Sequence, residues 1–333
     1  MREPTRPTRL LAVCAATLGL VAAALTGCAS TAPVSEPIAQ AAGAPVVSAW
    51  ADIPVTADIV YDADSGQSLD VCSPVDAVAG ASLPAVLVVH GGSWARGDKA
   101  DVNWRPICQW LAAEGFVAVS VNYRLAPDAV FPVQIDDVAN ALDFVLAPEQ
   151  TERFGIDPSR VAAFGGSAGG NLVSLLGTED ATSSRLAAVV DLSGPSDLTA
   201  AGLADDDPAV GVAAAVRTYL DCADLAACPQ AEEASPIAHV DGTEPSFFIA
   251  HSAEERIALS QSSRLADALT AAGASVEYLV VPGALHSIAM LDESLRGAVV
   301  EFLTAQLAEP DVQTLSLEPA GALEPTGAAE PAS

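Results

Sequence analysis

The chain has 333 residues and a strongly acidic composition, with 43 Asp and Glu residues against 14 Lys and Arg residues. Its formal net charge is −29 at pH 7, and 51% of its residues are hydrophobic. This balance argues against nucleic acids and anionic polymers as partners, because both are recognised by basic surfaces.

The N-terminal segment has the pattern of a signal peptide. Three arginines precede an apolar run from Leu10 to Leu25, which is too short for a comfortable membrane span. The run is followed by Thr26-Gly27-Cys28, and together these residues resemble a bacterial lipobox. We therefore expect removal of residues 1–27, acylation of Cys28 and a lipid-anchored, extracytoplasmic mature protein on the cell membrane. Plain secretion, with Cys28 incidental, is the alternative.

Composition divides the remaining chain into three parts. Residues 28–54 are rich in Ala, Pro and Ser and predict a flexible stalk, while residues 308–333 predict a disordered tail. Residues 55–307 suit one α/β domain with a mostly parallel sheet of about eight strands flanked by helices, because apolar runs alternate there with helical patterns. These runs lie near residues 58–61, 68–72, 85–90, 116–122, 160–164, 187–192, 246–250 and 276–281.

Two segments of this domain depart from the strand–helix alternation. The first two apolar runs flank Asp64-Ser65-Gly66 and are expected to form an edge hairpin. Residues 195–245 are rich in Asp, Ala and Pro and are predicted to form a small cap over the mouth of an active site. An inert surface insertion is the alternative for this second segment.

A glycine-containing loop, His90-Gly91-Gly92-Ser93-Trp94, follows the third apolar run. Two glycines directly after a buried strand leave backbone N–H groups free to stabilise a developing oxyanion. We predict Gly91 and Gly92 as such donors and Trp94 as a candidate pocket wall. An ordinary glycine turn is the alternative, and it is weakened by the serine turn further along the chain.

The strongest catalytic signal is Ser167, the centre of a G-x-S-x-G turn between an apolar strand and a helix-forming stretch. A serine on a sharp strand-to-helix turn is exposed as a nucleophile, and the amide of the following residue can bind the oxyanion. The context predicts Ser167 as the nucleophile and Ala168 as the other oxyanion donor.

A serine triad on this arrangement follows the chain order serine, acid, histidine. His286 comes after the apolar strand at 276–281, in a loop at its carboxyl end, and is the predicted base. The acid is expected after the preceding strand, at 246–250, where Glu254 and Glu255 are adjacent. We select Glu254 and keep Glu255 as the alternative.

With these motifs the chain resembles the α/β-hydrolase superfamily. The similarity is to its esterase/lipase branch, which includes hormone-sensitive-lipase-like and feruloyl-esterase/arylformamidase-like enzymes. Glutamate stands where the family usually has Asp, and Ser93 replaces the third glycine of the lipase-type loop, which favours the feruloyl-esterase/arylformamidase-like side. The matching stretches are 90–94 with 97–99, 121–127 with 131–132 and 136–138, 156–160, the Ser167 turn, 234–237 and 282–286.

The resemblance implies an α/β-hydrolase fold and a carboxylesterase-type serine hydrolase. A Ser167–His286–Glu254 triad would cleave a small-molecule ester through an acyl-enzyme, without a cofactor or metal. Amide cleavage, by an arylformamidase or a peptidase, is the alternative within enzymes. A non-catalytic hydrolase-fold binding module is less favoured, because the nucleophile and the base are both present.

The cysteines remaining after signal removal and acylation are even in number, as expected in an oxidising compartment. Cys222 and Cys228 flank five residues and are predicted to pair. Cys72 and Cys108 would then pair by elimination. A metal site is disfavoured, because no histidine lies at ligand spacing from either pair.

Overall fold

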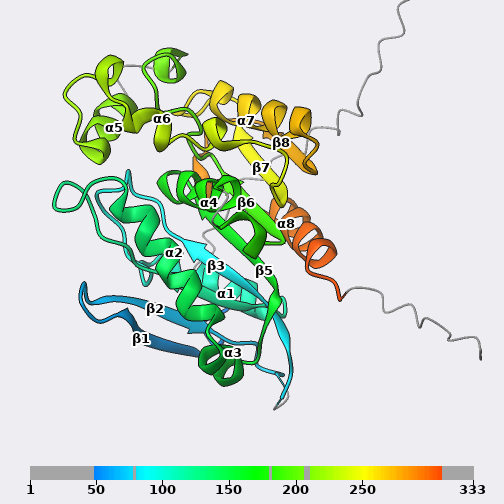
Figure 1. The fold of residues 1–333 in the computed structure, drawn as a ribbon. Coiled ribbons are helices and arrows are strands. Elements are labelled where there is room, and N and C mark those ends of the chain that lie inside the picture. Colours follow the sequence, from blue (N-terminus) through cyan, green and yellow to red (C-terminus); the bar gives the residue numbers. More distant parts are fainter. Residues whose placement is uncertain (1–48, 78–79, 180–181, 206–210, 310–333) are drawn as a thin grey trace, which may run out of the picture. The chain divides into compact units, whose positions relative to one another are not determined.

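A mixed β-sheet organises the part of the chain that the computed structural model describes, residues 49–77, 80–179, 182–205 and 211–309 (Figure 1). In these ranges the sheet has eight strands in the order β1-β2-β4-β3-β5-β6-β7-β8. The predicted signal peptide, Cys28 and most of the predicted stalk and tail lie outside the described residues. The strands are β1 (Val55–Asp62), β2 (Gln67–Cys72), β3 (Leu83–Val89), β4 (Val117–Val121), β5 (Ile156–Gly166), β6 (Ala188–Leu192), β7 (Ser246–Ser252) and β8 (Val276–Val281).

The pairing directions confirm the predicted sheet. Strands β1 and β2 form the expected antiparallel edge hairpin, and Gly66 adopts a φ of 72° in its turn. Strand β2 pairs antiparallel with β4, and all later pairs are parallel. The carboxyl ends of these parallel strands therefore meet at one edge of the sheet, where an open α/β sheet binds its ligands.

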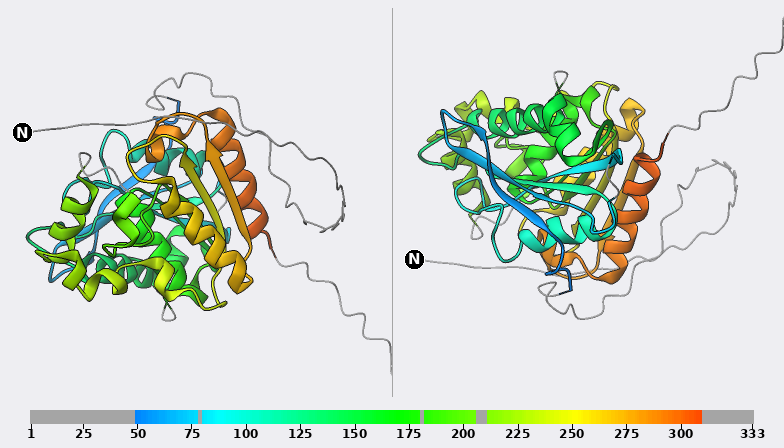
Figure 2. Two further views of the ribbon diagram at one scale, coloured as in Figure 1. Left: turned by 90° about the horizontal axis from the view of Figure 1, so that it is seen from above. Right: turned by 90° about the horizontal axis from the view of Figure 1, so that it is seen from below.

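Helices cover both faces of the sheet (Figure 2), which explains why the central strands are mostly apolar and why β4 and β6 are buried throughout. Helices α2, α4 and α7 pack with one face, and α1 and α8 with the other, so that the core forms two layers. The helices are α1 (Arg105–Ala113), α2 (Val133–Leu146), α3 (Pro148–Phe154), α4 (Ala168–Thr178), α5 (Val212–Leu220), α6 (Gln230–Glu233), α7 (Leu259–Ala272) and α8 (Glu293–Gln306). No helix of the described ranges is long and apolar enough to cross a membrane.

The segment predicted as a cap forms α5, α6 and short 3-10 turns, which Figure 1 shows together, well away from α3. Val216 and Tyr219 of α5 are fully buried and anchor the segment to the core. The side-chain amide of Asn171, on α4, donates to the carbonyl oxygens of Pro195 and Ala234, both at 3.1 Å. The segment is therefore held directly against the helix that begins after Ser167.

Both predicted cysteine pairs lie at disulfide distance. Cys72 of β2 and Cys108 of α1 have an S–S separation of 2.09 Å, and Cys222 and Cys228 one of 2.01 Å. The first pair ties the sheet to a covering helix, and the second closes a short loop after α5.

The sequence placed the start of the folded domain at residue 55, but packed residues already occur before that position. The ring centres of Trp50 and Trp110 lie 6.4 Å apart, and Arg296 lies over the Trp50 ring with Cζ 5.5 Å from its centre. The carbonyl of Ile53 also accepts a hydrogen bond from the side chain of Gln109 at 3.2 Å. The last residues of the expected stalk therefore belong to the folded domain.

Candidate active site

Ser167 stands on the sharp turn between β5 and α4 that the sequence predicted. Its backbone has φ 57° and ψ −124°, a conformation that L-residues rarely adopt. The flanking glycines make this turn possible, because a Cβ on Gly165 would lie 2.3 Å from the carbonyl oxygen of Gly169. The amide of Ser167 donates to the carbonyl of Leu192 at 2.9 Å, which fixes the turn to β6.

The glycine loop after β3 lies directly against this serine. A Cβ on Gly91 would lie 3.2 Å from the Cβ of Ser167 and 2.6 Å from the carbonyl oxygen of Gly166. Gly92 has a φ of 132°, and a Cβ there would meet the carbonyl oxygen of Arg96 at 1.9 Å. Both positions therefore require glycine, and the loop is held beside the predicted nucleophile.

The amides of Gly91, Gly92 and Ala168 are suitable oxyanion donors. The described part of the chain shows no hydrogen bond from the amides of the two loop glycines. Ala168 is the first residue of α4, so its amide has no acceptor within the helix. These predicted donors are thus near Ser167 and available to a ligand.

His90 supports the loop and does not face the pocket. Its ring is buried and stacks on Tyr123 with centroids 4.4 Å apart, and the Tyr123 hydroxyl donates to the His90 carbonyl at 2.9 Å. Burial lowers the pKa of His90 although the adjoining carbonyl of Gly91 opposes this. A Cβ on Gly97 would lie 2.5 Å from the ring, so that glycine makes room for it.

The structure places Glu255, the alternative acid, beside His286, and not the selected Glu254. The Nδ1 atom of His286 donates to Oε2 of Glu255, whose side chain is fully buried. Glu254 is exposed, and its backbone amide donates to the carbonyl of Gly283 at 2.9 Å. That bond fixes the chain so that the next side chain, and not Glu254, turns inward to the histidine.

A second histidine, His251, binds the other oxygen of Glu255. Its Nε2 lies 2.7 Å from Oε1 of Glu255 and 3.0 Å from the carbonyl of Ile257, while its Nδ1 lies 2.7 Å from the hydroxyl of Ser262. Burial raises the pKa of Glu255, but the hydrogen bonds and charges of His251 and His286 outweigh it and lower the pKa to about 2. Glu255 is therefore a carboxylate throughout the physiological range.

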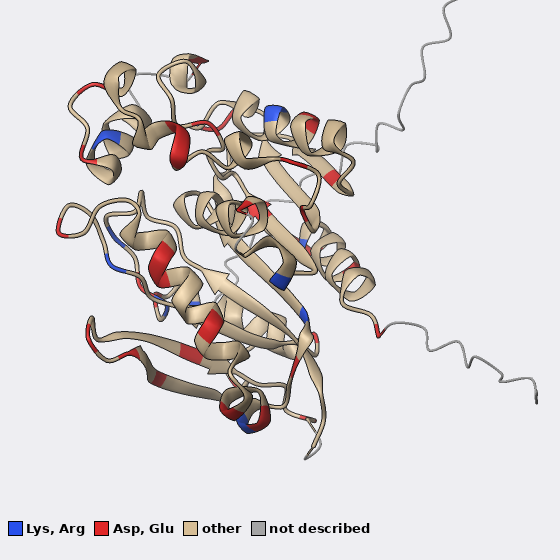
Figure 3. Cartoon of the chain, viewed as in Figure 1, with Lys and Arg blue, Asp and Glu red and all other residues tan. Residues whose placement is uncertain are grey.

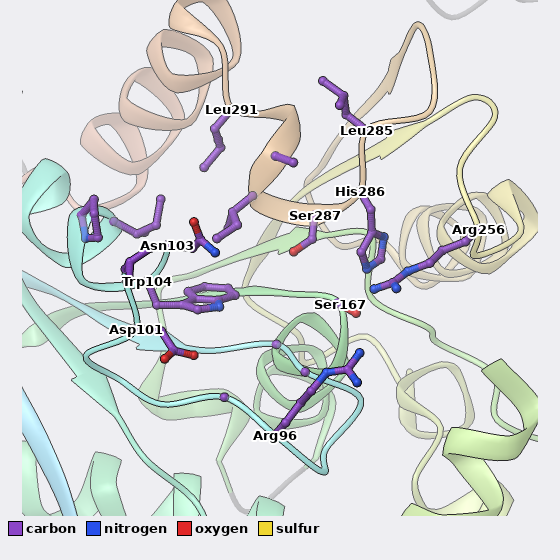
Figure 4. A pocket seen from close by; sticks show the side chains of 18 residues that line it. Arg96, Asp101, Asn103, Trp104, Ser167, Arg256, Leu285, His286, Ser287 and Leu291 are labelled. Carbon is purple, nitrogen blue, oxygen red and sulfur yellow. The ribbon is translucent and has the colours of Figure 1, made fainter. Parts of the chain in front are cut away.

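Ser167 and His286 line one pocket with a volume of about 820 Å³, together with Gly91 and Gly92 (Figure 4). The Nε2 atom of His286 is shielded from solvent and has no hydrogen-bond partner among the described residues. Because Nδ1 carries the proton donated to Glu255, Nε2 is left as the acceptor. Figure 4 shows the His286 ring reaching toward Ser167.

A smaller pocket of about 50 Å³ lies on the other side of Ser167. Val212 and Ala215 of α5 line it, together with Trp94 and Ile257. The Trp94 ring is fixed by stacking on Tyr219, with centroids 4.3 Å apart, and by a 3.2 Å hydrogen bond from Nε1 to Asn171. Trp94 is thus a pocket wall, and α5 contributes to the space beside the nucleophile.

The described residues contain no group of three or more His, Cys, Asp or Glu side chains that could hold a metal ion. Sequence reasoning kept Glu255 as the alternative acid but missed His251. The one signal for His251 was its place near the end of β7, four residues before Glu255.

The sheet order, its covering helices and the serine turn define the α/β-hydrolase fold. A truncated carbohydrate esterase from gut microbiota shares this fold, with a TM-score of 0.65 and 24% identity over 77% of this chain and 97% of that chain. The BD-FAE family model matches residues 69–269, and the chain belongs to the BD-FAE family.

Curated relatives include esterases. Esterase LipC of Mycobacterium tuberculosis is 29% identical over 257 residues, or 72% of this chain and 61% of that protein. Neutral cholesterol ester hydrolase 1 of Mus musculus is 41% identical over 96 residues, or 28% of this chain and 24% of that protein. The chain thus spans less than two thirds of the length of either relative.

Proposed function

We propose that the protein hydrolyses carboxylic esters through Ser167, His286 and Glu255. The observation that carries the proposal is the buried hydrogen bond from His286 to Glu255, beside a nucleophile turn that lines the same pocket. The names of two mycobacterial relatives, Esterase LipC and Probable carboxylic ester hydrolase LipM, support ester cleavage, whereas other relatives are named arylacetamide deacetylases. The same residues could attack an amide, so an amide analogue belongs in every substrate test.

In the proposed mechanism, Nε2 of His286 accepts the Ser167 proton as Oγ attacks the acyl carbon. Glu255 holds the proton on Nδ1 and stabilises the imidazolium that forms. The amides of Gly91, Gly92 and Ala168 bind the oxyanion. His286 then returns the proton to the departing alcohol, and water cleaves the acyl-enzyme by the same route.

The two pockets divide the substrate between them. The alcohol must leave on the side of His286, because that ring protonates it, and His286 lines the larger pocket. The acyl group then occupies the smaller pocket, where Trp94, Val212 and Ala215 supply apolar walls and Arg256 lines the same space. Its volume of about 50 Å³ favours short acyl groups such as acetyl. This assigns the predicted cap segment a role in limiting acyl length.

A fluorophosphonate probe and a pair of glutamine variants test the proposal. The probe should label wild type and not Ser167→Ala. Glu255→Gln should lower kcat by about 10⁴-fold, because the wrong histidine tautomer is then favoured. Glu254→Gln is the matched control and should stay near wild type. Labelling of another serine, or a crippled Glu254→Gln beside an active Glu255→Gln, would refute the assignment.

We further propose that Cys28 carries a lipid that holds the enzyme outside the cytoplasmic membrane. The sequence from Leu25 to Cys28 and the Ala/Pro-rich segment that follows support it. Full-length protein should partition into detergent, and Cys28→Ser should abolish both lipid labelling and partitioning. Wild-type protein recovered from the medium with an unmodified Cys28 would show that the segment serves secretion alone.

A further inference from the structure

Two arginines enter the larger pocket from opposite parts of the sequence. Arg96 comes from the loop after β3 and Arg256 from the loop after β7, and both line the pocket with Ser167 and His286. Figure 4 shows both guanidinium groups extending toward Ser167. The two guanidinium groups therefore lie at the end of the pocket that contains the proposed nucleophile.

Neither guanidinium is used by the fold. In the described part of the chain, Arg96 and Arg256 have no ion pair and no aromatic contact, whereas Arg124, for example, pairs with Asp137. Both side chains are exposed. Arginines without a structural partner beside a nucleophile are available to a ligand.

This pairing is unusual for so acidic a chain. Only 14 of its 333 residues are Lys or Arg, and Figure 3 shows acidic residues, in red, on many elements. The larger pocket contains one carboxylate side chain, Asp101, which accepts the amide of Asp98 at 3.1 Å. In Figure 4 Asp101 lies beside Trp104, on the side away from Arg256. The lining of the larger pocket therefore has a net positive charge, although the whole chain has a net negative charge.

Resting on the proposed hydrolysis, we propose that the alcohol part of the substrate carries an oxyanion, a carboxylate or a phosphate, which Arg96 and Arg256 bind. A guanidinium presents parallel N–H donors that match both groups. The distant acidic residues oppose this little, because salt screens exposed charges beyond about 8 Å. The alcohol and not the acyl group carries the charge, because Arg96 and Arg256 meet only in the larger pocket. Arg256 also lines the smaller pocket, but Arg96 does not, and that pocket has a volume of only about 50 Å³.

The test compares aryl acetates that carry a carboxylate, a phosphate or a neutral amide at the same position of the alcohol ring. The substrates are 4-acetoxybenzoate, 4-acetoxyphenyl phosphate and the neutral 4-acetoxybenzamide. The quantity measured is the ratio of kcat/KM for each anionic ester to that for the amide-bearing ester. We expect each ratio to be about ten or more in wild type, and the larger of the two ratios identifies carboxylate or phosphate as the preferred group. Both ratios should fall as the salt concentration rises.

Arg96→Gln and Arg256→Gln should each lower this ratio by about tenfold, mainly through KM, because the interaction is made with bound substrate before chemistry. Arg217→Gln is the matched control, since Arg217 is exposed on α5, has no ion pair among the described residues and does not line either pocket. It should keep the wild-type ratio.

The outcomes separate this inference from the proposed function. A wild-type ratio near one, unchanged in both arginine variants, with hydrolysis of all three esters, would overturn the anion site and leave the esterase intact. Absence of hydrolysis of every ester, with no probe labelling of Ser167, would overturn the esterase and the anion site together.

Discussion

The Nε2 atom of His251 lies 2.7 Å from Oε1 of Glu255, and both side chains are fully buried. The carboxylate is therefore held by a histidine on each oxygen, one facing the pocket and one facing the core. Only the pocket-side ring can reach a substrate. His251 is a positioning residue, which acts through Glu255.

Replacing His251 by Phe should lower kcat by about tenfold. The ring space stays filled, but Oε1 of a buried carboxylate loses the imidazole nitrogen that lies 2.7 Å away in ion-pair contact, so that His286 alone holds the carboxylate. In a Glu255→Gln background the same replacement should have little further effect, because the carboxylate through which it acts is gone. Steady-state kinetics of the four proteins would check this.

The control for this cycle is His239→Phe, because His239 lies in the 195–245 segment and contacts the carbonyl of Glu233 instead. It should retain wild-type kcat. If His251→Phe lowered kcat equally with and without Glu255, its effect would be one of general packing and not of positioning the triad.

The pKa of Glu255 predicts a specific loss of stability in acid. Its pKa is about 2 in the folded protein, below the ordinary value of 4.5 that applies to the unfolded chain. As pH falls, the unfolded chain therefore binds a proton at Glu255 before the folded protein does. The stabilisation is complete above about pH 4.5, declines between about 4.5 and 2, and is absent below. At 1.36 kcal/mol per pKa unit, wild type should lose about 2 kcal/mol at pH 3 that Glu255→Gln does not.

Urea unfolding at pH 6 and pH 3 would measure this difference. Glu254→Gln provides the control, because that side chain is exposed and should leave the acid sensitivity of wild type unchanged. Equal acid sensitivity of wild type and Glu255→Gln would mean that the two histidines do not hold the carboxylate as described.

Much of the fold could be predicted because its signals are local. A strand buried on both faces is mostly apolar, so β3, β4 and β6 are visible as apolar runs in spite of Ser120 and Asp191. The nucleophile turn is also local, because its glycines are adjacent to Ser167 in the sequence. Such features need no knowledge of distant contacts.

The acid of the triad could not be resolved in the same way. Glu254 and Glu255 have the same chemistry, and the choice between them depends on a hydrogen bond from Glu254 to Gly283, in another loop. Similarly, Arg96 and Arg256 are 160 positions apart and meet only because β3 and β7 end at the same edge of the sheet. Tertiary structure decides both features.

Adding a methyl group at Gly91 should damage catalysis more than folding. A Cβ there would lie 2.6 Å from the Gly166 carbonyl oxygen and would push the glycine loop away from Ser167. Loss of one oxyanion donor costs about 10²–10³-fold in kcat. We expect a decrease of this size in Gly91→Ala, with near-normal circular dichroism.

Gly297→Ala is the matched change, because a Cβ at this position of α8 would meet nothing within 4 Å. It should keep full activity and gain about 0.5–1 kcal/mol of stability from helix propensity. Full activity of Gly91→Ala would show that the loop does not supply the oxyanion donors.

The packing of Trp50 predicts where the folded domain can be shortened. A protein beginning at residue 49 keeps the contact of Trp50 with Trp110 and the hydrogen bond from Gln109 to Ile53, whereas one beginning at residue 55 loses both. The longer protein should match full-length protein in free energy of unfolding, and the shorter should be about 2–3 kcal/mol less stable. Trp50→Ala in the longer protein should account for roughly half of that loss.

Hydrolysis per folded molecule should be equal in the longer protein, the shorter protein and the Trp50→Ala variant, because the proposed catalytic residues begin at Gly91. Equal denaturation midpoints for the two truncated proteins would show that Trp50 and Ile53 are not part of the stable core.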